Sequence, residues 1–316
     1  MSKTFPITDT DGRRCTVVAD DGVPIAVRSF GAKDAALTVV FVHGHCLHTE
    51  SWSLLREHLL REWDADARMV FYDHRGHGES GHAHHATYTI DQLATDLDAV
   101  LRAVAPTGPV VLVGHSMGAM VVLAYARLYP AAIGHRVAGI GLIAGAAGSI
   151  TEVGLGRLLN RHAVASLQRA VVHAPRVMQA SKRFSRWIFA PLFREASTGT
   201  RRVNPRVAAI ATAVLNETAL LTMSGFLSSL LDFDEAHTLP HFGDLPALVL
   251  AGSADLMMPF AHSVVLASQL AGAELVRIEG AGHNVILDRA GEVAHSIIAL
   301  AERASIDARA RYAVAG

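Results

Sequence analysis

The chain has 316 residues, of which 51% are hydrophobic and 18% are charged, and its formal net charge is −1. This balance argues against disorder and against a general nucleic-acid-binding surface, and the length is sufficient for a sizeable core. The two cysteines, Cys15 and Cys46, lack the spacing of a disulfide framework or a zinc cluster. The first residues lack the apolar segment of a secretion signal, and no apolar run approaches the roughly 20 residues of a membrane span. We therefore expect a cytoplasmic protein.

Strand-like and helix-like stretches alternate along the first half of the chain. Two strand-like stretches on either side of Asp21-Gly22 predict an antiparallel hairpin over 13–30. Further strands are expected over 36–42, 67–72, 109–114 and 136–145, and helices over 50–63, 89–105 and 116–129. Such alternation predicts an α/β fold in which helices cover both faces of a mostly parallel central sheet.

The pattern changes in the second half of the chain. Residues 149–243 contain helix-like segments and no good strand, which predicts a helical insertion. Strands resume at 246–252 and 273–280, a closing helix is expected over 289–304, and the tail 306–316 is expected to be loose. We therefore divide the chain into a core domain, 1–148 and 244–316, and a helical cap or lid domain, 149–243.

A G-x-S-x-G pentapeptide, Gly114-His115-Ser116-Met117-Gly118, joins an expected strand to an expected helix. The pentapeptide alone is common by chance, but this context is that of a sharp turn, the nucleophile elbow, which raises a serine above the edge of a sheet. The start of the helix also offers free backbone N–H groups where an oxyanion would form. Ser116 is therefore a candidate nucleophile, and the alternative is a serine that only caps a helix.

A serine nucleophile requires a base, and the base requires an acid that orients it. Asp255 follows the strand 246–252, and His283 lies in a Gly-x-His turn after the strand 273–280. Because parallel strands end at the same edge of a sheet, Ser116, Asp255 and His283 are expected to meet as a catalytic triad. The carboxylates that compete with Asp255 for this role are Asp73, Asp232, Asp234 and Glu235.

The segment FVHGHC supplies a second loop at the end of the strand 36–42. His43-Gly44 turns the chain there, so we expect the backbone N–H groups of His45 and Met117 to form an oxyanion hole. The side chains of His43 and His115, together with Gly44, are expected to shape the substrate-binding site.

The segments FVHGHC, FYDHRGHGES, VGHSMG, AGSADLMMP and GAGH together resemble the α/β-hydrolase superfamily, in its branch of lid-bearing bacterial serine esterases and lipases. The resemblance covers nearly all of residues 20–305, although the insertion matches only as a helical cap. It implies a serine hydrolase that cleaves carboxylic esters through an acyl-enzyme and needs no cofactor. Ser116 departs from the epoxide-hydrolase and haloalkane-dehalogenase branches, in which the nucleophile is an aspartate.

Other functions stay open at this point. The same triad serves hydrolases of C–C bonds and enzymes that make peracids, and a non-catalytic receptor with this fold is a third possibility. The turn DHRGHGES, 73–80, could contact substrate, but a glycine-rich loop held by hydrogen bonds from Asp73 or Arg75 to the backbone is the favoured interpretation. The histidines of the chain match no compact metal spacing, so no metal is expected.

The composition of the cap suggests what it contacts. Residues 151–206 carry 11 Lys and Arg against two Glu, and 181–193 mixes cations with aromatic residues. Such a segment could contact a lipid surface, although a solvated basic face is the simpler interpretation. An apolar acyl or alkyl group of a small-molecule ester would be lined by cap side chains, and the candidates are Leu155, Leu158, Met178, Met223 and Phe226. The oligomeric state stays open.

Overall fold

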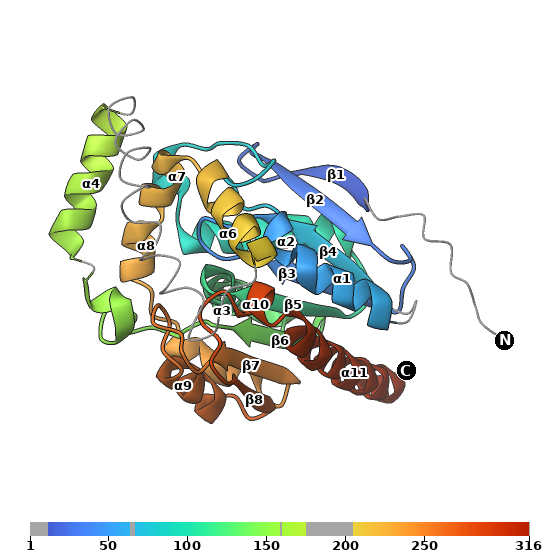
Figure 1. Cartoon of the computed structure of the whole chain (residues 1–316). Coiled ribbons are helices and arrows are strands. Elements are labelled where there is room, and N and C mark those ends of the chain that lie inside the picture. The colour runs from blue at the N-terminus through green and yellow to red at the C-terminus, as the bar shows by residue number, and fades with distance from the viewer. Residues whose placement is uncertain (1–11, 64–66, 159, 175–204, 316) are drawn as a thin grey trace.

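The computed structural model describes residues 12–63, 67–158, 160–174 and 205–315. This part of the chain forms an eight-stranded sheet in the order β1-β2-β4-β3-β5-β6-β7-β8, with helices on both faces (Figure 1). β1 (Arg13–Val18) and β2 (Pro24–Phe30) form the antiparallel edge, whereas all pairs from β4 to β8 are parallel. The predicted mostly parallel sheet with a hairpin at its edge is confirmed.

The core elements follow the predicted alternation closely. The parallel strands are β3 (Leu37–Val42), β4 (Ala67–Tyr72), β5 (Val110–His115), β6 (Val137–Ile143), β7 (Ala247–Gly252) and β8 (Ala273–Ile278). The helices around them are α1 (Ser53–Glu62), α2 (Ile90–Val104), α3 (Met117–Leu128), α9 (Ala261–Gln269), α10 (Val285–Asp288) and α11 (Ala290–Ala315). Short 3-10 helices are η1 (Thr49–Trp52), η2 (His85–Thr87), η3 (Pro130–Ala132), η4 (Gly154–Leu158) and η5 (Ala236–Phe242).

Two apolar layers enclose the sheet because successive side chains of a strand point to opposite faces. Val40 and Val42 of β3 belong to the layer that contains α2 and α3, whereas Val39 and Phe41 belong to the layer that contains α1 and α11. In Figure 1, α1 and α11 lie side by side along one face, and they pack against each other. β3, β5, β6 and β7 are buried along their whole length, as expected of central parallel strands.

The insertion between β6 and β7 is helical in the residues that the structure describes. It contains α4 (Arg161–His173), α6 (Pro205–Glu217), α7 (Leu220–Gly225) and α8 (Leu227–Leu231). α6 contacts η1, and α7 contacts η2. Both 3-10 helices follow the carboxyl ends of strands, so the insertion lies over this edge of the sheet. Figure 1 shows α4, α7 and α8 gathered there. The division into a core and a separate cap stays a prediction.

The expectation of a loose tail is wrong. α11 continues to Ala315, well beyond the predicted end at 304. Ala304 and Ala308 are buried, and a Cβ atom placed on Gly139 of β6 would lie only 3.0 Å from the Cβ of Ala304. Small side chains thus let the helix pack closely on the sheet. The polar residues of the tail sequence do not signal this packing. Within the described residues, no helix combines the length and the apolar character that crossing a membrane requires.

Candidate active site

Ser116 stands at the junction of β5 and α3 in a strained backbone conformation. Its φ is +54° and its ψ is −119°, a region that residues other than glycine rarely adopt. The turn is tight: a Cβ atom on Gly118 would lie 2.0 Å from the carbonyl oxygen of Val42, and one on Gly114 would lie 2.4 Å from the carbonyl carbon of Gly118. Only glycine fits at these two positions, which explains the spacing of the pentapeptide.

Three loops bring Ser116, His283 and Asp255 into one hydrogen-bonded series. The Nε2 atom of His283 lies 2.9 Å from the Oγ atom of Ser116, and its Nδ1 atom lies 2.8 Å from the Oδ2 atom of Asp255. Ser116 is partly exposed, whereas His283 and Asp255 are buried. An imidazole between a hydroxyl and a carboxylate can accept the hydroxyl proton while the carboxylate stabilises the resulting charge.

The carboxylate of Asp255 is fixed in orientation by its own loop. Its Oδ1 atom accepts hydrogen bonds from the backbone N–H groups of Met257 and Met258, both at 2.8 Å. The other oxygen is left for the Nδ1–H group of His283. This donor fixes the tautomer in which Nε2 faces Ser116 as an acceptor.

A hydrogen bond from His115 also stabilises the loop that carries His283. The Nε2–H group of His115 donates to the carbonyl oxygen of His283 at 3.0 Å, and the His115 side chain is fully buried. Burial lowers the pKa of His115 to about 3, so this imidazole stays neutral. His115 therefore helps to hold the His283 loop, while the expected contact with substrate stays a prediction.

The loop after β3 lies directly beside Ser116. A Cβ atom on Gly44 would lie 3.1 Å from the Cβ of Ser116, so a side chain at this position would crowd the serine. Met117 is the first residue of α3, and such N–H groups have no partner within their own helix. His43 is fully buried, and its Nδ1–H group donates to the carbonyl oxygen of Gly44 at 2.8 Å. The proximity agrees with the oxyanion hole expected from His45 and Met117, which stays a prediction.

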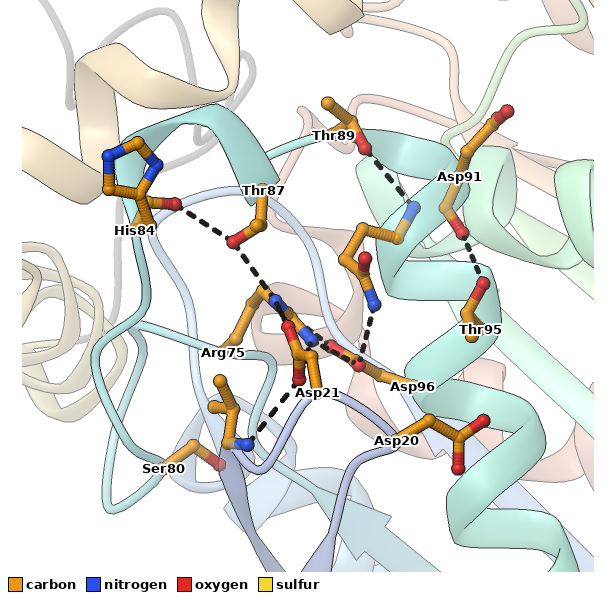
Figure 2. Close-up of polar contacts among 12 residues, drawn as sticks. Asp20, Asp21, Arg75, Ser80, His84, Thr87, Thr89, Asp91, Thr95 and Asp96 are labelled. Carbon is orange, nitrogen blue, oxygen red and sulfur yellow. Dashed lines mark hydrogen bonds and ion pairs between the residues drawn. The ribbon is translucent and has the colours of Figure 1, made fainter.

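The turn DHRGHGES has the structural role that the sequence analysis favours. Asp73 accepts hydrogen bonds from the backbone N–H groups of Thr49 at 2.7 Å and Glu79 at 2.8 Å. Arg75 bonds side chains rather than the backbone: Figure 2 shows its guanidinium between Asp21 and Asp96. Both groups hold the loops around the site in place.

The competing carboxylates are engaged elsewhere in the described structure. Glu235 forms an ion pair with Arg127 at 2.7 Å, and Asp232 forms one with Arg161. The Oδ1 atom of Asp234 accepts from the backbone N–H group of Ala236, and Asp73 is bonded as described above. In the described part of the chain, the carboxylate that contacts His283 is that of Asp255.

The expected lining residues are only partly described. Met178, the segment 181–193 and the side chain of Leu158 lie outside the described residues, so the lipid contact and part of the pocket stay predictions. Leu155 is 42% exposed. Phe226 is fully buried, with its ring 6.0 Å from the ring of His45, so it packs beneath the loop after β3.

α7 and the loop before it contact the loop after β3. Burial lowers the pKa of His45 to about 4, and a hydrogen bond to the backbone of Met223 offsets part of this effect. Thr218 bonds the carbonyl oxygen of Cys46. The sequence analysis missed this role of Thr218, and no pattern in the sequence signals it.

The described residues contain no group of three or more His, Cys, Asp or Glu side chains arranged to hold a metal ion. The histidines of the loops around the site instead bond backbone groups and one another's loops, as with His43 and His74. Their burial and neutral state fit structural roles.

Comparison with known proteins identifies the family. The model of the alpha/beta hydrolase fold family matches residues 38–290, so the chain belongs to this family. In structure it is similar to a thermophilic esterase from Thermogutta terrifontis, with a TM-score of 0.73, 23% identity, and coverage of 93% of this chain and 100% of that one. At this identity, the likeness establishes the fold.

Two curated relatives match shorter segments of the chain. Epoxide hydrolase 4 of Mus musculus is 32% identical over 121 residues, which are 38% of this chain and 32% of that protein. Monoacylglycerol lipase of Mycolicibacterium smegmatis is 32% identical over 96 residues, or 29% of this chain and 33% of that protein. The chain thus spans about a third of the length of these relatives. Together the matches support a hydrolase with esterase-like relatives.

Proposed function

We propose that this protein is a serine hydrolase that cleaves carboxylic esters. The observation that carries the proposal is the hydrogen-bonded series from Asp255 through His283 to Ser116, with distances of 2.8 and 2.9 Å. The strained elbow at Ser116 adds support, because such strain persists where it serves a function. The relatives named esterase and lipase agree with this chemistry.

In the first half of the reaction, the Oγ atom of Ser116 attacks the ester carbonyl carbon while the Nε2 atom of His283 takes the hydroxyl proton. The negative charge on the former carbonyl oxygen is stabilised by the N–H groups of His45 and Met117. The C–O bond to the alcohol then breaks, and His283 returns the proton to the leaving alcohol. Asp255 orients His283 and stabilises its transient positive charge.

In the second half, His283 takes a proton from water, and the hydroxide attacks the acyl carbon. Collapse of the second tetrahedral intermediate breaks the bond to the Oγ atom of Ser116, which regains its proton from His283. The products are the free acid and the resting enzyme. Apart from the substrate and this water, each step uses only side chains and backbone groups of this chain.

The substrate is an ester with an apolar acyl or alkyl group. Phe226, between α7 and α8 of the insertion, has its ring 6.0 Å from that of His45 in the loop after β3, and the ring of Tyr88 lies 5.1 Å from Phe226. Both aromatic side chains are fully buried, and burial keeps His45 neutral. Neutral imidazoles and aromatic rings favour an uncharged guest.

The decisive test is covalent labelling by a fluorophosphonate. We expect stoichiometric labelling of the wild type and none of Ser116→Ala, while Ser268→Ala, which changes an exposed serine of α9, labels fully. Labelling that survives in Ser116→Ala would overturn the assignment of the nucleophile.

A panel of p-nitrophenyl esters of increasing acyl length, run on the same proteins, defines the acyl group. Parallel assays with a vinylogous diketone and with hydrogen peroxide plus a carboxylic acid test C–C bond cleavage and peracid formation. Labelling of Ser116 without turnover of any ester would refute ester hydrolysis but retain the nucleophile.

A further inference from the structure

The loop after β3 contains a turn that is strained at Cys46. The N–H group of Leu47 donates to the carbonyl oxygen of Gly44 at 3.2 Å, which closes a four-residue turn. Cys46, its third residue, has a φ of +60° and is buried. Turns with this φ favour glycine at the third position, so a cysteine there needs support from its surroundings. The second residue of the turn is His45, the expected oxyanion donor.

His77 of the turn 73–80 supports Cys46 from one side. Its Nε2 atom accepts the N–H group of Cys46 at 3.3 Å, and its Nδ1–H group donates to the carbonyl oxygen of Arg75 at 3.1 Å. Both ring nitrogens are thereby used, one as acceptor and one as donor, which requires a neutral imidazole in a single tautomer. Burial keeps the pKa of His77 well below its ordinary value, so the acceptor is present at neutral pH.

Thr218 supports Cys46 from the other side. It lies between α6 and α7 of the insertion, it is buried, and its Oγ1–H group donates to the carbonyl oxygen of Cys46 at 3.2 Å. The strained residue is thus held at its N–H group by a loop of the sheet edge and at its C=O group by the insertion. These two contacts come from segments more than 130 residues apart in the chain.

Two further hydrogen bonds join the loop after β3 to the loop 73–80 beside this turn. The Nε2 atom of His43 accepts the backbone N–H group of His74 at 2.9 Å, and the Nε2–H group of His74 donates to the carbonyl oxygen of His43 at 3.0 Å. Because Arg75 anchors the loop 73–80 to Asp21 and Asp96, the position of the turn at Cys46 depends on a rigid support.

We propose that His77 and Thr218 are positioning residues, which hold the turn at Cys46 so that the N–H group of His45 is aimed at the oxyanion formed on Ser116. The inference rests on the proposed ester hydrolysis. An oxyanion donor acts only when it lies about 2.7–3.1 Å from the developing charge, and a displacement of about 1 Å can cost about 100-fold in rate. Substrate binding in the ground state does not require this accuracy.

The first test compares His77→Leu with His77→Gln. Leucine occupies a similar space but removes the acceptor that Nε2 of His77 offers to the N–H group of Cys46, whereas the amide oxygen of glutamine can replace Nε2. We expect kcat per fluorophosphonate-titrated site to fall about 10- to 100-fold in His77→Leu with KM within about twofold, and to stay within about threefold of wild type in His77→Gln. His85→Leu, the same change at an exposed histidine of η2, should behave as wild type.

The second test uses two small changes at Thr218. Thr218→Val replaces the hydroxyl group by a methyl group of similar size, and Thr218→Ser keeps the hydroxyl group but lacks the methyl group. We expect kcat per titrated site to fall about 3- to 10-fold in Thr218→Val and to be restored in Thr218→Ser. In both tests, the inhibition constant of a trifluoromethyl ketone, which forms a tetrahedral oxyanion on the serine, should rise in parallel with the loss of kcat/KM.

The outcomes separate the inference from the proposed function. If the wild type is not labelled and turns over no ester, the proposed function fails and the inference fails with it. If the wild type is active but His77→Leu and Thr218→Val lose only titratable sites, with unchanged kcat per site and unchanged ketone inhibition, the two residues are merely structural. That result would overturn the positioning role and leave the ester hydrolase intact.

Discussion

Asp255 and Asp96 are both buried carboxylates with hydrogen bonds to both oxygens, yet their partners differ in kind. Asp96 receives the Nε–H and Nη2–H groups of Arg75 at 2.7 and 2.6 Å, and both side chains are fully buried. Asp255 receives two backbone N–H groups and the imidazole of His283. Asp96 faces a permanent cation, Arg75, whereas Asp255 faces an imidazole that can gain and lose a proton.

This difference separates a structural site from a chemical one. Burial alone would lower the pKa of Arg75, but the carboxylates of Asp96 and Asp21 raise it above its ordinary value, so the guanidinium stays charged. In Figure 2, Arg75 of the loop 73–80 contacts both Asp21 of the hairpin turn and Asp96 of α2, so the three segments are joined. At the Asp255 site, the positive charge exists only while His283 holds the proton. The comparison predicts that Asp255 controls turnover and that the Arg75–Asp96 pair controls the stability of the fold.

The largest expected effect is that of Asp255→Asn on turnover. The amide oxygen can still accept the N–H groups of Met257 and Met258, but the amide NH₂ group then faces the Nδ1 atom of His283 and favours the wrong tautomer. We expect kcat to fall by roughly 10⁴-fold with little change in the denaturant midpoint. Steady-state kinetics and urea unfolding on the same preparation measure both quantities.

The matched control for this prediction is Asp232→Asn, which changes an exposed carboxylate of the insertion that pairs with Arg161. It should retain wild-type turnover. If Asp255→Asn stays near wild type while an insertion variant loses activity, the orienting acid has been assigned to the wrong residue.

The second expected effect is that of Arg75→Met on stability. Removal of the guanidinium leaves Asp96 buried without its cation, and the loss of one partner of a buried pair costs about 3–5 kcal/mol in the free energy of unfolding. The deficit should shrink as the pH falls, because protonation of Asp96 removes the unpaired charge. The activity of each folded molecule should change far less than in Asp255→Asn, as measured by urea unfolding and active-site titration.

Arg14→Met is the control for burial of the pair. Arg14 forms an ion pair with Glu79, and both side chains are more than half exposed. Exposed pairs contribute about 0–1 kcal/mol, so this variant should unfold near the wild-type midpoint. Equal destabilisation by the two arginine variants would contradict the importance of burial.

Asp288 extends the comparison to a carboxylate that no arginine or imidazole hydrogen-bonds in the described structure, where the charge of Arg289 offsets only part of the effect of burial. Its expected effect is the smallest. Its Oδ2 atom is buried and has no hydrogen-bond partner within the described residues, and burial raises the pKa of Asp288 from 3.8 to about 6. The folded state thus binds this proton more tightly than the unfolded state. The associated stability is present below about pH 4 and is lost as the pH rises towards 6.

We therefore expect Asp288→Asn to flatten the pH dependence of stability between pH 4 and 6 and to stabilise the protein at pH 7. The gain should be about 1 kcal/mol, a value reduced for solvent screening because the side chain is only partly buried. Unfolding curves across this pH range measure it. A variant as pH-dependent as the wild type would place the unfavourable charge elsewhere.

Local patterns in the sequence were sufficient where the structure repeats a simple period. The apolar runs at 36–42, 109–114 and 246–252 became β3, β5 and β7 within one or two residues. The tail after 304 was misjudged because Ala308 is buried by the tertiary packing of the helix, which the tail sequence does not signal. α9 was not anticipated either, since its apolar residues follow the loop of Asp255 without a clear helical start.

The sequence by itself determined the order of the elements and the positions of Ser116, Asp255 and His283 at strand ends, because parallel strands bring their carboxyl ends together. Only the tertiary structure decided which carboxylate meets His283, how Arg75 is neutralised and which groups hold Cys46. These contacts join residues distant in the chain, such as Thr218 and Cys46. They depend on how loops pack in three dimensions, which hydrophobic periodicity and turn residues do not encode.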